Sequence, residues 1–385
     1  MKNLIYTAIL SMLLFSCREK SSKTELPLIP AENFETTVDG TPVALYTLDS
    51  GNGLVMQVTN YGGRIVTLFT PDKNGHYEDV VLGFDSMDKY INNQGERYLG
   101  PAIGRYANRI ANARFEIDGV EYSLPANDNG NCLHGGLKGF DSRAWNVDTV
   151  SGNHIQLSYV SPDGDEGFPG TVEVQMTYTL TADNELKIDY RAVTDKSTHI
   201  NLTNHSQFNL KGAGNGDILN HILTVNADYI TPVNNLLIPT GELMPVAGTP
   251  FDFNLPTITG ERINEDNPQL KMGNGYDHNW VINRKTEKET EWAVTLYEPE
   301  SGRIMEVWTD QPGIQIYTGN FFNGFVKGKY GKPFIHRCAI ALETQKYPDT
   351  PNQPAFPSTR LNPGEVYTQT CIYKFSVEPS TNFTN

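Results

Sequence analysis

Residues 171–180 read "TVEVQMTYTL", and apolar and polar side chains alternate along this stretch. A period of two is typical of a β-strand that buries one face, because successive side chains point to opposite sides of a sheet. The same alternation recurs in "HIQLSYV" (154–160), "ELKIDYRAV" (185–193) and "EWAVTLYEP" (291–299). Turn sequences punctuate the chain at "PDKNGH" (71–76), "TADNE" (181–185) and "PESG" (299–302). The pattern predicts a large antiparallel sheet.

Helical sequence is scarce in this chain, and "DSMDKYINN" (85–93) is the one short helix that we expect. The 385 residues include 34 glycines and 23 prolines, which suits many strands joined by long loops. No repeat of fixed period, low-complexity block or shift in composition divides the sequence. We therefore predict an all-β protein, a large antiparallel β-sandwich, with a single domain over residues 34–380.

The N-terminal residues 1–16, "MKNLIYTAILSMLLFS", resemble a secretory signal peptide, with a positive start followed by an apolar run. The run is too short to span a bilayer, which takes about 20 apolar residues. The ending "LLFSC" is similar to a bacterial lipoprotein cleavage site, with small Ser16 before Cys17. We expect an exported protein with a lipid on Cys17, a polar tether over 17–33, and a membrane-anchored location in the periplasm or at the cell surface. An ordinary cleaved signal with an incidental cysteine is the alternative.

Charge and cysteine content exclude several classes of function. The formal net charge is -15, so the chain has no electrostatic footprint for nucleic acid. Besides Cys17, the cysteines are far apart and lack CxxC spacing: Cys132, Cys338 and Cys371. This spacing supports neither a zinc knuckle nor a disulfide framework. Buried free thiols are expected, and a single bridge is the alternative in an exported protein.

Polar residues gather in loop-like segments from several parts of the sequence. These are "GRYANRIANARF" (104–115), "NCLHGGLKGFDSRAW" (131–145), "NLTNHSQFNL" (201–210), "GNGYDHNWVI" (273–282), and "QPGIQIYTGN" (311–320) with "LETQKYPDTPNQPAF" (342–356). Glycine lets the backbone approach a ligand closely. Aromatic faces pack on C–H surfaces, while planar amides and guanidinium groups fix the directions of hydroxyls. The combination predicts a pocket for a neutral monosaccharide.

These segments resemble the aldose 1-epimerase family, also called galactose mutarotases. The family signature Asn-x-Thr-Asn-His-x-Tyr-Phe-Asn-Leu matches 201–210 except at Gln207, where the family usually has tyrosine. "GRYANRI", "LHGG", "YDHN", "QPGIQ" and "LETQ" occur in the family's order. The resemblance covers nearly the whole mature chain. It implies a galactose mutarotase-like supersandwich with the sugar in an open cleft on one sheet.

The resemblance also implies roles for individual residues. Glu343, in "LETQ", would be the general base that takes the proton from the anomeric hydroxyl, and His205 the general acid that protonates the ring oxygen. The residues that match the family's sugar-binding positions are Asn108, Arg109, His134, Asp277 and Gln315. No metal or organic cofactor is implied, and we expect a monomer or weak dimer.

The chemistry of anomer exchange calls for such a pair. The hemiacetal opens, the chain rotates about C1–C2, and the ring closes on the other face, so one base and one acid suffice, each worth about 10²–10⁴-fold. No redox step or activated phosphate is needed, which fits the absence of nucleotide-binding glycine motifs. The site should shift both pKa values toward neutrality. We expect the carboxylates of Asp277 and Glu343 to raise the pKa of His205, and burial to raise that of Glu343.

Other functions would need different sets of residues. An epimerase of phosphorylated hexoses should need a cluster of cations at the cleft, and the polar segments supply few. A non-catalytic sugar-binding lipoprotein would not need both Glu343 and His205. A glycoside hydrolase needs two spaced carboxylates, for which Asp277 and Glu343 are a conceivable pair. His134, His205 and Asp277 have the residue types of a metal site, but not its sequence spacing.

Overall fold

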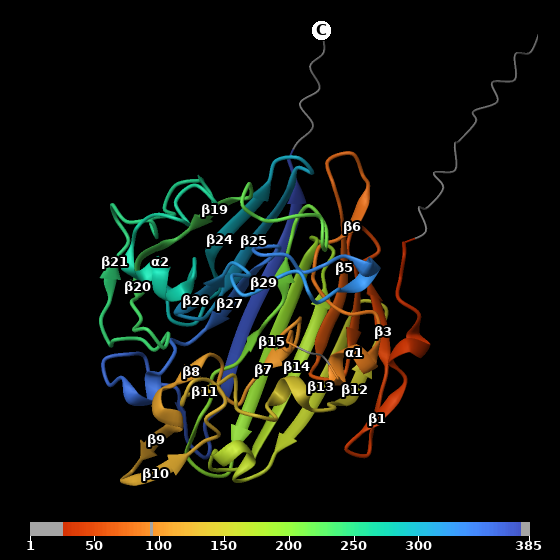
Figure 1. The fold of residues 1–385 in the computed structure, drawn as a ribbon. Helices are drawn as coiled ribbons and strands as arrows, with labels where there is room; N and C mark the ends of the chain where they lie inside the picture. The colour runs from red at the N-terminus through yellow and green to blue at the C-terminus, as the bar shows by residue number, and fades with distance from the viewer. Residues whose placement is uncertain (1–25, 93–94, 379–385) are drawn as a thin grey trace, which may run out of the picture.

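The computed structural model describes residues 26–92 and 95–378, and their regular structure is dominated by β-strands (Figure 1). The named strands pair antiparallel throughout the described ranges, so the predicted all-β class is confirmed. The predicted signal peptide 1–16 and Cys17 lie outside the described residues. Within those residues, no helix has the length and apolar character needed to cross a bilayer.

The largest sheet of the described residues has nine strands, and its long green-to-blue strands run through the middle of Figure 1. In spatial order they are β12 (Asn146–Val150), β13 (His154–Ser161), β14 (Val172–Leu180), β15 (Glu185–Thr194), β29 (Tyr367–Val377), β25 (Arg303–Thr309), β24 (Glu291–Glu298), β19 (Ile222–Val225) and β22 (Thr257–Ile258). Every second residue of β14 is buried, from Val172 to Leu180. The four strands predicted from alternation are therefore β13, β14, β15 and β24.

A second sheet, of six strands in the described residues, carries the polar segments. In order it contains β18 (Gln207–Phe208), β27 (Ile340–Gln345), β26 (Gly313–Tyr317), β23 (Asp277–Ile282), β20 (Ala227–Thr231) and β21 (Met244–Pro245). The residues of these strands that belong to the hydrophobic core include Phe208, Ile340, Leu342, Ile314, Ile316 and Trp280. Phe208 packs on Tyr373 of β29 with ring centroids 5.0 Å apart, and the Tyr373 hydroxyl donates to the Leu342 carbonyl at 2.8 Å. The six-stranded sheet thus packs one face on the nine-stranded sheet, which makes the predicted sandwich.

Smaller elements surround the two sheets. A four-stranded sheet contains β3 (Leu45–Asp49), β4 (Val55–Thr59), β5 (Arg64–Pro71) and β6 (Tyr77–Asp79). The two-stranded pairs are β1 (Thr36–Val38) with β2 (Thr41–Val43), β9 (Arg114–Ile117) with β10 (Val120–Ser123), β8 (Arg109–Ile110) with β11 (Cys132–Leu133), β16 (Thr198–His199) with β28 (Arg360–Leu361), and β7 (Ala102–Ile103) with β17 (Thr203–Asn204). The α-helices are α1 (Met87–Ile91), inside the predicted helical segment, and α2 (Pro268–Gly273). The 3₁₀ helices are η1 (Ala31–Phe34), η2 (Ala111–Ala113), η3 (Phe140–Ser142), η4 (Asp165–Gly167), η5 (Lys329–Gly331) and η6 (Thr350–Asn352).

The described part of the predicted tether packs on the β-structure. Ile29 is buried, and its amide donates to the side chain of Gln57 on β4 at 2.9 Å, while the Gln57 amide donates back to the Ile29 carbonyl at 2.9 Å. Cys132, Cys338 and Cys371 are buried free thiols, as expected.

Candidate active site

Strand register brings the polar side chains of the six-stranded sheet into two rows. Because side chains alternate along a strand, the odd-numbered residues of β18, β27, β26 and β23 share the face opposite the core. The pairing Gln207–Ala341–Tyr317–Asp277 forms one row, which we call the alanine row. The pairing Glu343–Gln315–Asn279 forms the next, the glutamate row. His205 precedes β18 and faces Glu343 at the end of the glutamate row.

A cavity of about 230 Å³ opens over these rows. Of the residues predicted to form the site, those that line it are Asn108, Arg109, His134, His205, Asp277 and Glu343. Gln315 is not among the lining residues; its amide donates to Asp277 Oδ1 at 2.6 Å and so holds that carboxylate in place. Segments that are far apart in sequence therefore converge on one pocket.

His205 and Glu343 form a buried acid/base pair. His205 Nε2 lies 3.5 Å from Glu343 Oε1, and the two side chains are 8% and 2% exposed. Burial raises the pKa of Glu343 well above its usual value, and the charge of Asp277 adds to this effect while Arg109 opposes it. Burial also lowers the pKa of His205 to about 4, against backbone carbonyls of His205 and Tyr98 that favour its protonation. The expected increase in the histidine pKa is therefore wrong, because desolvation of the imidazolium outweighs the nearby carboxylates.

His134 is held in one tautomer by the backbone. The Asn108 amide donates to His134 Nδ1 at 3.1 Å, and the His134 amide donates to the Asn108 carbonyl at 3.0 Å. Burial lowers the pKa of His134 well below its usual value, so the ring is neutral. A neutral ring that accepts at Nδ1 carries its proton on Nε2. His134 is thereby prepared to donate one hydrogen bond to an oxygen in the cavity.

Arg109 places a positive charge near the carboxylates of the cavity. Its Nε donates to Asp128 Oδ2 at 2.7 Å, which fixes the guanidinium plane. Arg109 lowers the pKa of both Asp277 and Glu343, although burial is the larger effect and leaves both raised. The sequence prediction missed Asp128, although "ANDNG" directly precedes the "LHGG" segment in the chain.

The prediction also missed the aromatic wall of the cavity. The Tyr98 ring lies 4.6 Å from the ring of His134 and 5.8 Å from that of His205, between centroids. Arg97 stacks over Tyr98 at 5.1 Å and is fixed by Asp141 through hydrogen bonds of 2.7 and 2.9 Å. Tyr317 and Phe321 also line the cavity, and their rings stack with centroids 6.1 Å apart. The positions of these aromatic residues in the sequence could have identified them, because "ERYLG" directly precedes "PAIGRYANRI" and "FF" directly follows "YTGN".

The cavity also holds residues that could bind a metal ion or take up a proton. His134, His205 and Glu343 offer ligand atoms within 4.8 Å of one another, so they, rather than the set with Asp277, have the proximity of a metal site. The tautomer of His134 places a proton, not a lone pair, on Nε2, and this favours hydrogen bonding over coordination there. Glu96 also lines the cavity, and burial raises its pKa to about 7.

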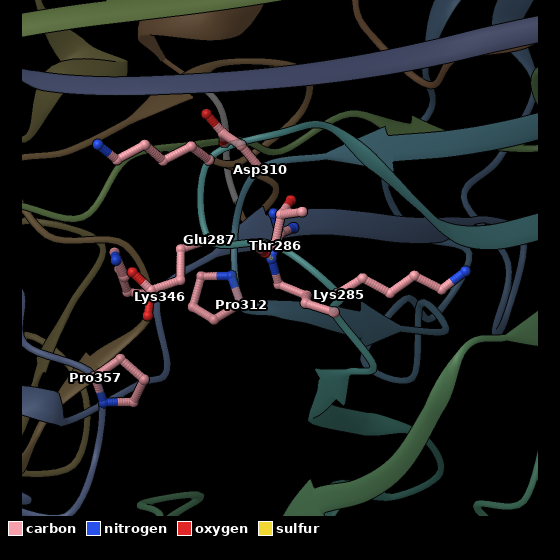
Figure 2. A pocket seen from close by; sticks show the side chains of 9 residues that line it. Lys285, Thr286, Glu287, Asp310, Pro312, Lys346 and Pro357 are labelled. Atoms are coloured by element: carbon pink, nitrogen blue, oxygen red, sulfur yellow. Dashed lines mark hydrogen bonds between the residues drawn. The ribbon is translucent and has the colours of Figure 1, made fainter.

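Figure 2 shows a second cavity, of about 520 Å³, beside Asp310, Pro312 and Lys346. None of its lining residues lines the first cavity. The Arg284 guanidinium there donates to backbone carbonyls of Thr286, Thr309, Gln311 and Glu289, so it acts as a brace for the loop. The acid/base pair distinguishes the smaller cavity as the candidate active site.

Comparisons with known proteins agree with this geometry. The profile of the aldose 1-epimerase family matches residues 44–374. Galactose mutarotase of Rattus norvegicus is 45% identical over 324 residues, which cover 84% of this chain and 92% of the rat protein. Aldose 1-epimerase of Escherichia coli is 36% identical, with 88% and 97% covered. The crystal structure of an aldose epimerase homologue from C. elegans superposes with a TM-score of 0.80 at 31% identity, covering 87% of this chain and 99% of that one.

Proposed function

The chain belongs to the aldose 1-epimerase family and is an aldose 1-epimerase, and we propose that Glu343 is its general base and His205 its general acid. Glu343 removes the proton from the anomeric hydroxyl, and His205 delivers one to the ring oxygen. The observation that carries the proposal is the 3.5 Å contact between the two groups inside the cavity. The proposed sugar-binding residues are Asn108, Arg109, His134 and Asp277, and Gln315 is proposed to act through Asp277, to which its amide donates.

The pair needs to share only one proton throughout the cycle. With the cyclic sugar bound, the reactive state is carboxylate plus imidazolium; after ring opening it is carboxylic acid plus neutral imidazole. Reclosure on either face of C1 reverses both transfers, so turnover regenerates the starting state. Burial disfavours the carboxylate of Glu343 and, separately, the imidazolium of His205. The neutral form of the pair, carboxylic acid plus imidazole, is the form present with the open-chain sugar.

Free hexoses such as glucose and galactose are the proposed substrates. The cationic residues among the described lining of the cavity are Arg97 and Arg109. Asp141 pairs with Arg97 and Asp128 with Arg109, so neither guanidinium is reserved for a phosphate. Polarimetry of freshly dissolved α-D-glucose and α-D-galactose tests the activity directly. Mutarotation no faster than in buffer would overturn the proposed function.

The pH profile is expected to report the shared proton. Below about pH 4 the pair takes up a second proton at His205, and kcat/KM should fall. At the alkaline end the raised pKa of Glu343 is exceeded, the pair loses its only proton, and activity should fall again. Between these limits the rate should be nearly constant. Initial rates measured by polarimetry from pH 3.5 to about pH 10, corrected for buffer catalysis, check this shape. A decline that begins near pH 6.5, the ordinary value for imidazole, would contradict it.

The proposed location is a membrane surface, through a lipid on Cys17 after removal of residues 1–16, with a single catalytic domain over 34–380. The cleavage-site pattern before Cys17 supports this proposal. Expression of the full chain in a bacterium should place the protein in the membrane fraction. Cys17→Ser should shift most of it to the soluble fraction at unchanged kcat, because Cys17 lies far outside the catalytic segments. Equal membrane association of both forms would contradict the anchor. Sedimentation of the Cys17→Ser protein should show a monomer or weak dimer.

A further inference from the structure

Gln207 is buried in the wall of the cavity with an unsatisfied polar atom. The side chain is 3% exposed, lines the cavity, and its Oε1 has no hydrogen-bond partner among the described residues. Buried side-chain polar atoms are nearly always paired, because an unpaired one costs the full desolvation of the group. The carboxamide of Gln207, whose side chain lines the cavity, therefore keeps hydrogen-bonding capacity that a bound ligand can satisfy. This is also the one position where "NLTNHSQFNL" departs from the family signature.

The surroundings hold Gln207 in this position. Its carbonyl accepts from the Leu82 amide at 2.8 Å, and it pairs with Ala341 in the register of β18 and β27. The next residue, Phe208, is fully buried in the core. Because the backbone is fixed on both sides, the carboxamide is positioned by the fold rather than by a flexible loop.

The two rows define which part of the sugar meets Gln207. With Glu343 at the anomeric hydroxyl and His205 at the ring oxygen, the bond from C1 to the ring oxygen lies along the glutamate row. The cavity extends over the alanine row, whereas Gln345 and Gly313, on the opposite side of the glutamate row, do not line it. The remaining ring carbons would therefore lie on the side of the cavity that Gln207, Tyr317 and Asp277 line. C2, bonded to C1, faces Tyr317 and Asp277, and C5, bonded to the ring oxygen, faces Gln207.

We propose that Gln207 binds the hydroxymethyl group on C5 of a hexose and makes the enzyme prefer sugars that carry its hydroxyl. The inference rests on the proposed acid and base assignments. A carboxamide can accept from this hydroxyl and donate to it at once. Tyrosine offers a single hydroxyl on a rigid ring at the same place. Gln207 is thus a specificity residue for the side of the ring remote from bond cleavage.

D-Galactose and its 6-deoxy form, D-fucose, differ only in this hydroxyl and test the proposal. For the intact enzyme, kcat/KM for galactose should exceed that for fucose by about tenfold or more, since a site built to bond a hydroxyl rejects the analogue without it. Gln207→Leu removes the polar atoms and leaves an apolar side chain that ends one atom short of the carboxamide oxygen and nitrogen. It should lower kcat/KM for galactose by about tenfold and leave fucose within about threefold, which removes the preference.

Gln57→Leu is the matched control, because Gln57 is equally buried but bonds the backbone of Ile29 away from the cavity. It should keep the galactose-to-fucose ratio of the intact enzyme. Gln207→Asn, which withdraws the carboxamide by one methylene, provides a second test if Gln207→Leu does not fold. An unchanged ratio in the folded Gln207 variants would overturn the inference. Lack of activity of the intact enzyme on both sugars would instead overturn the proposed function.

Discussion

Glu343→Gln is expected to lower kcat for mutarotation of galactose by about 10⁴-fold, the upper end of the range for a general base. Glutamine has the same shape and can still bond the anomeric hydroxyl, but it cannot accept the proton. The loss should appear in kcat, because the proposed substrate contacts from Arg109, His134 and Asp277 remain. Polarimetry at saturating and at low α-D-galactose separates kcat from KM and checks this result.

The thermal stability of the same variant provides the control. The pKa of Glu343 is raised on folding, so its contribution to stability is greatest at low pH and is lost as pH rises through the folded-state value. Glutamine removes that loss. The melting temperature of Glu343→Gln should therefore equal or exceed that of the intact enzyme at pH 8, while the two differ least at pH 4. An inactive variant with a higher melting temperature cannot owe its inactivity to unfolding. Retention of more than about a tenth of kcat would move the base to another group, with Asp277 the next candidate.

Sequence patterns predicted the sandwich well where one face of a strand is solvated. β14 alternates strictly, and its buried and exposed residues are those that the sequence indicates. β27 behaves differently, since all its residues from Ile340 to Gln345 are buried, on the core face and on the cavity face alike. Alternation could not have located such a strand, because neither of its faces is solvated.

The parts of the site that sequence could not predict depend on three-dimensional surroundings. The direction of the pKa shift of His205 is decided by desolvation from many segments, and no single neighbour in the sequence reports it. The tautomer of His134 depends on the Asn108 amide, and the orientation of Arg109 depends on Asp128. Residue types predicted which groups could react; packing determines their protonation and direction. Substitution of His205 therefore tests the proposed shared proton most directly.

His205→Asn is expected to lower kcat at pH 7 by about 10²–10⁴-fold, because the ring oxygen must then be protonated by water. The pH dependence should change as well. The intact enzyme is expected to lose activity at the alkaline end, where the proposed pair loses its proton. In His205→Asn the remaining requirement is an ionised Glu343, whose pKa is raised by burial. Residual kcat should therefore rise with pH over the range in which the intact enzyme declines.

His134→Asn is the matched control for this change, because it removes a neutral imidazole 5.1 Å from the His205 ring, between centroids, and leaves the acid/base pair in place. It should raise KM, since one hydrogen-bond donor to the sugar is lost, and it should keep the falling alkaline limb. Rates of both variants from pH 6 to about pH 10, measured by polarimetry against buffer blanks, distinguish the two roles. If both variants showed the same alkaline decline as the intact enzyme, His205 would be a binding residue, and the proton for the ring oxygen would have to come from another donor in the cavity.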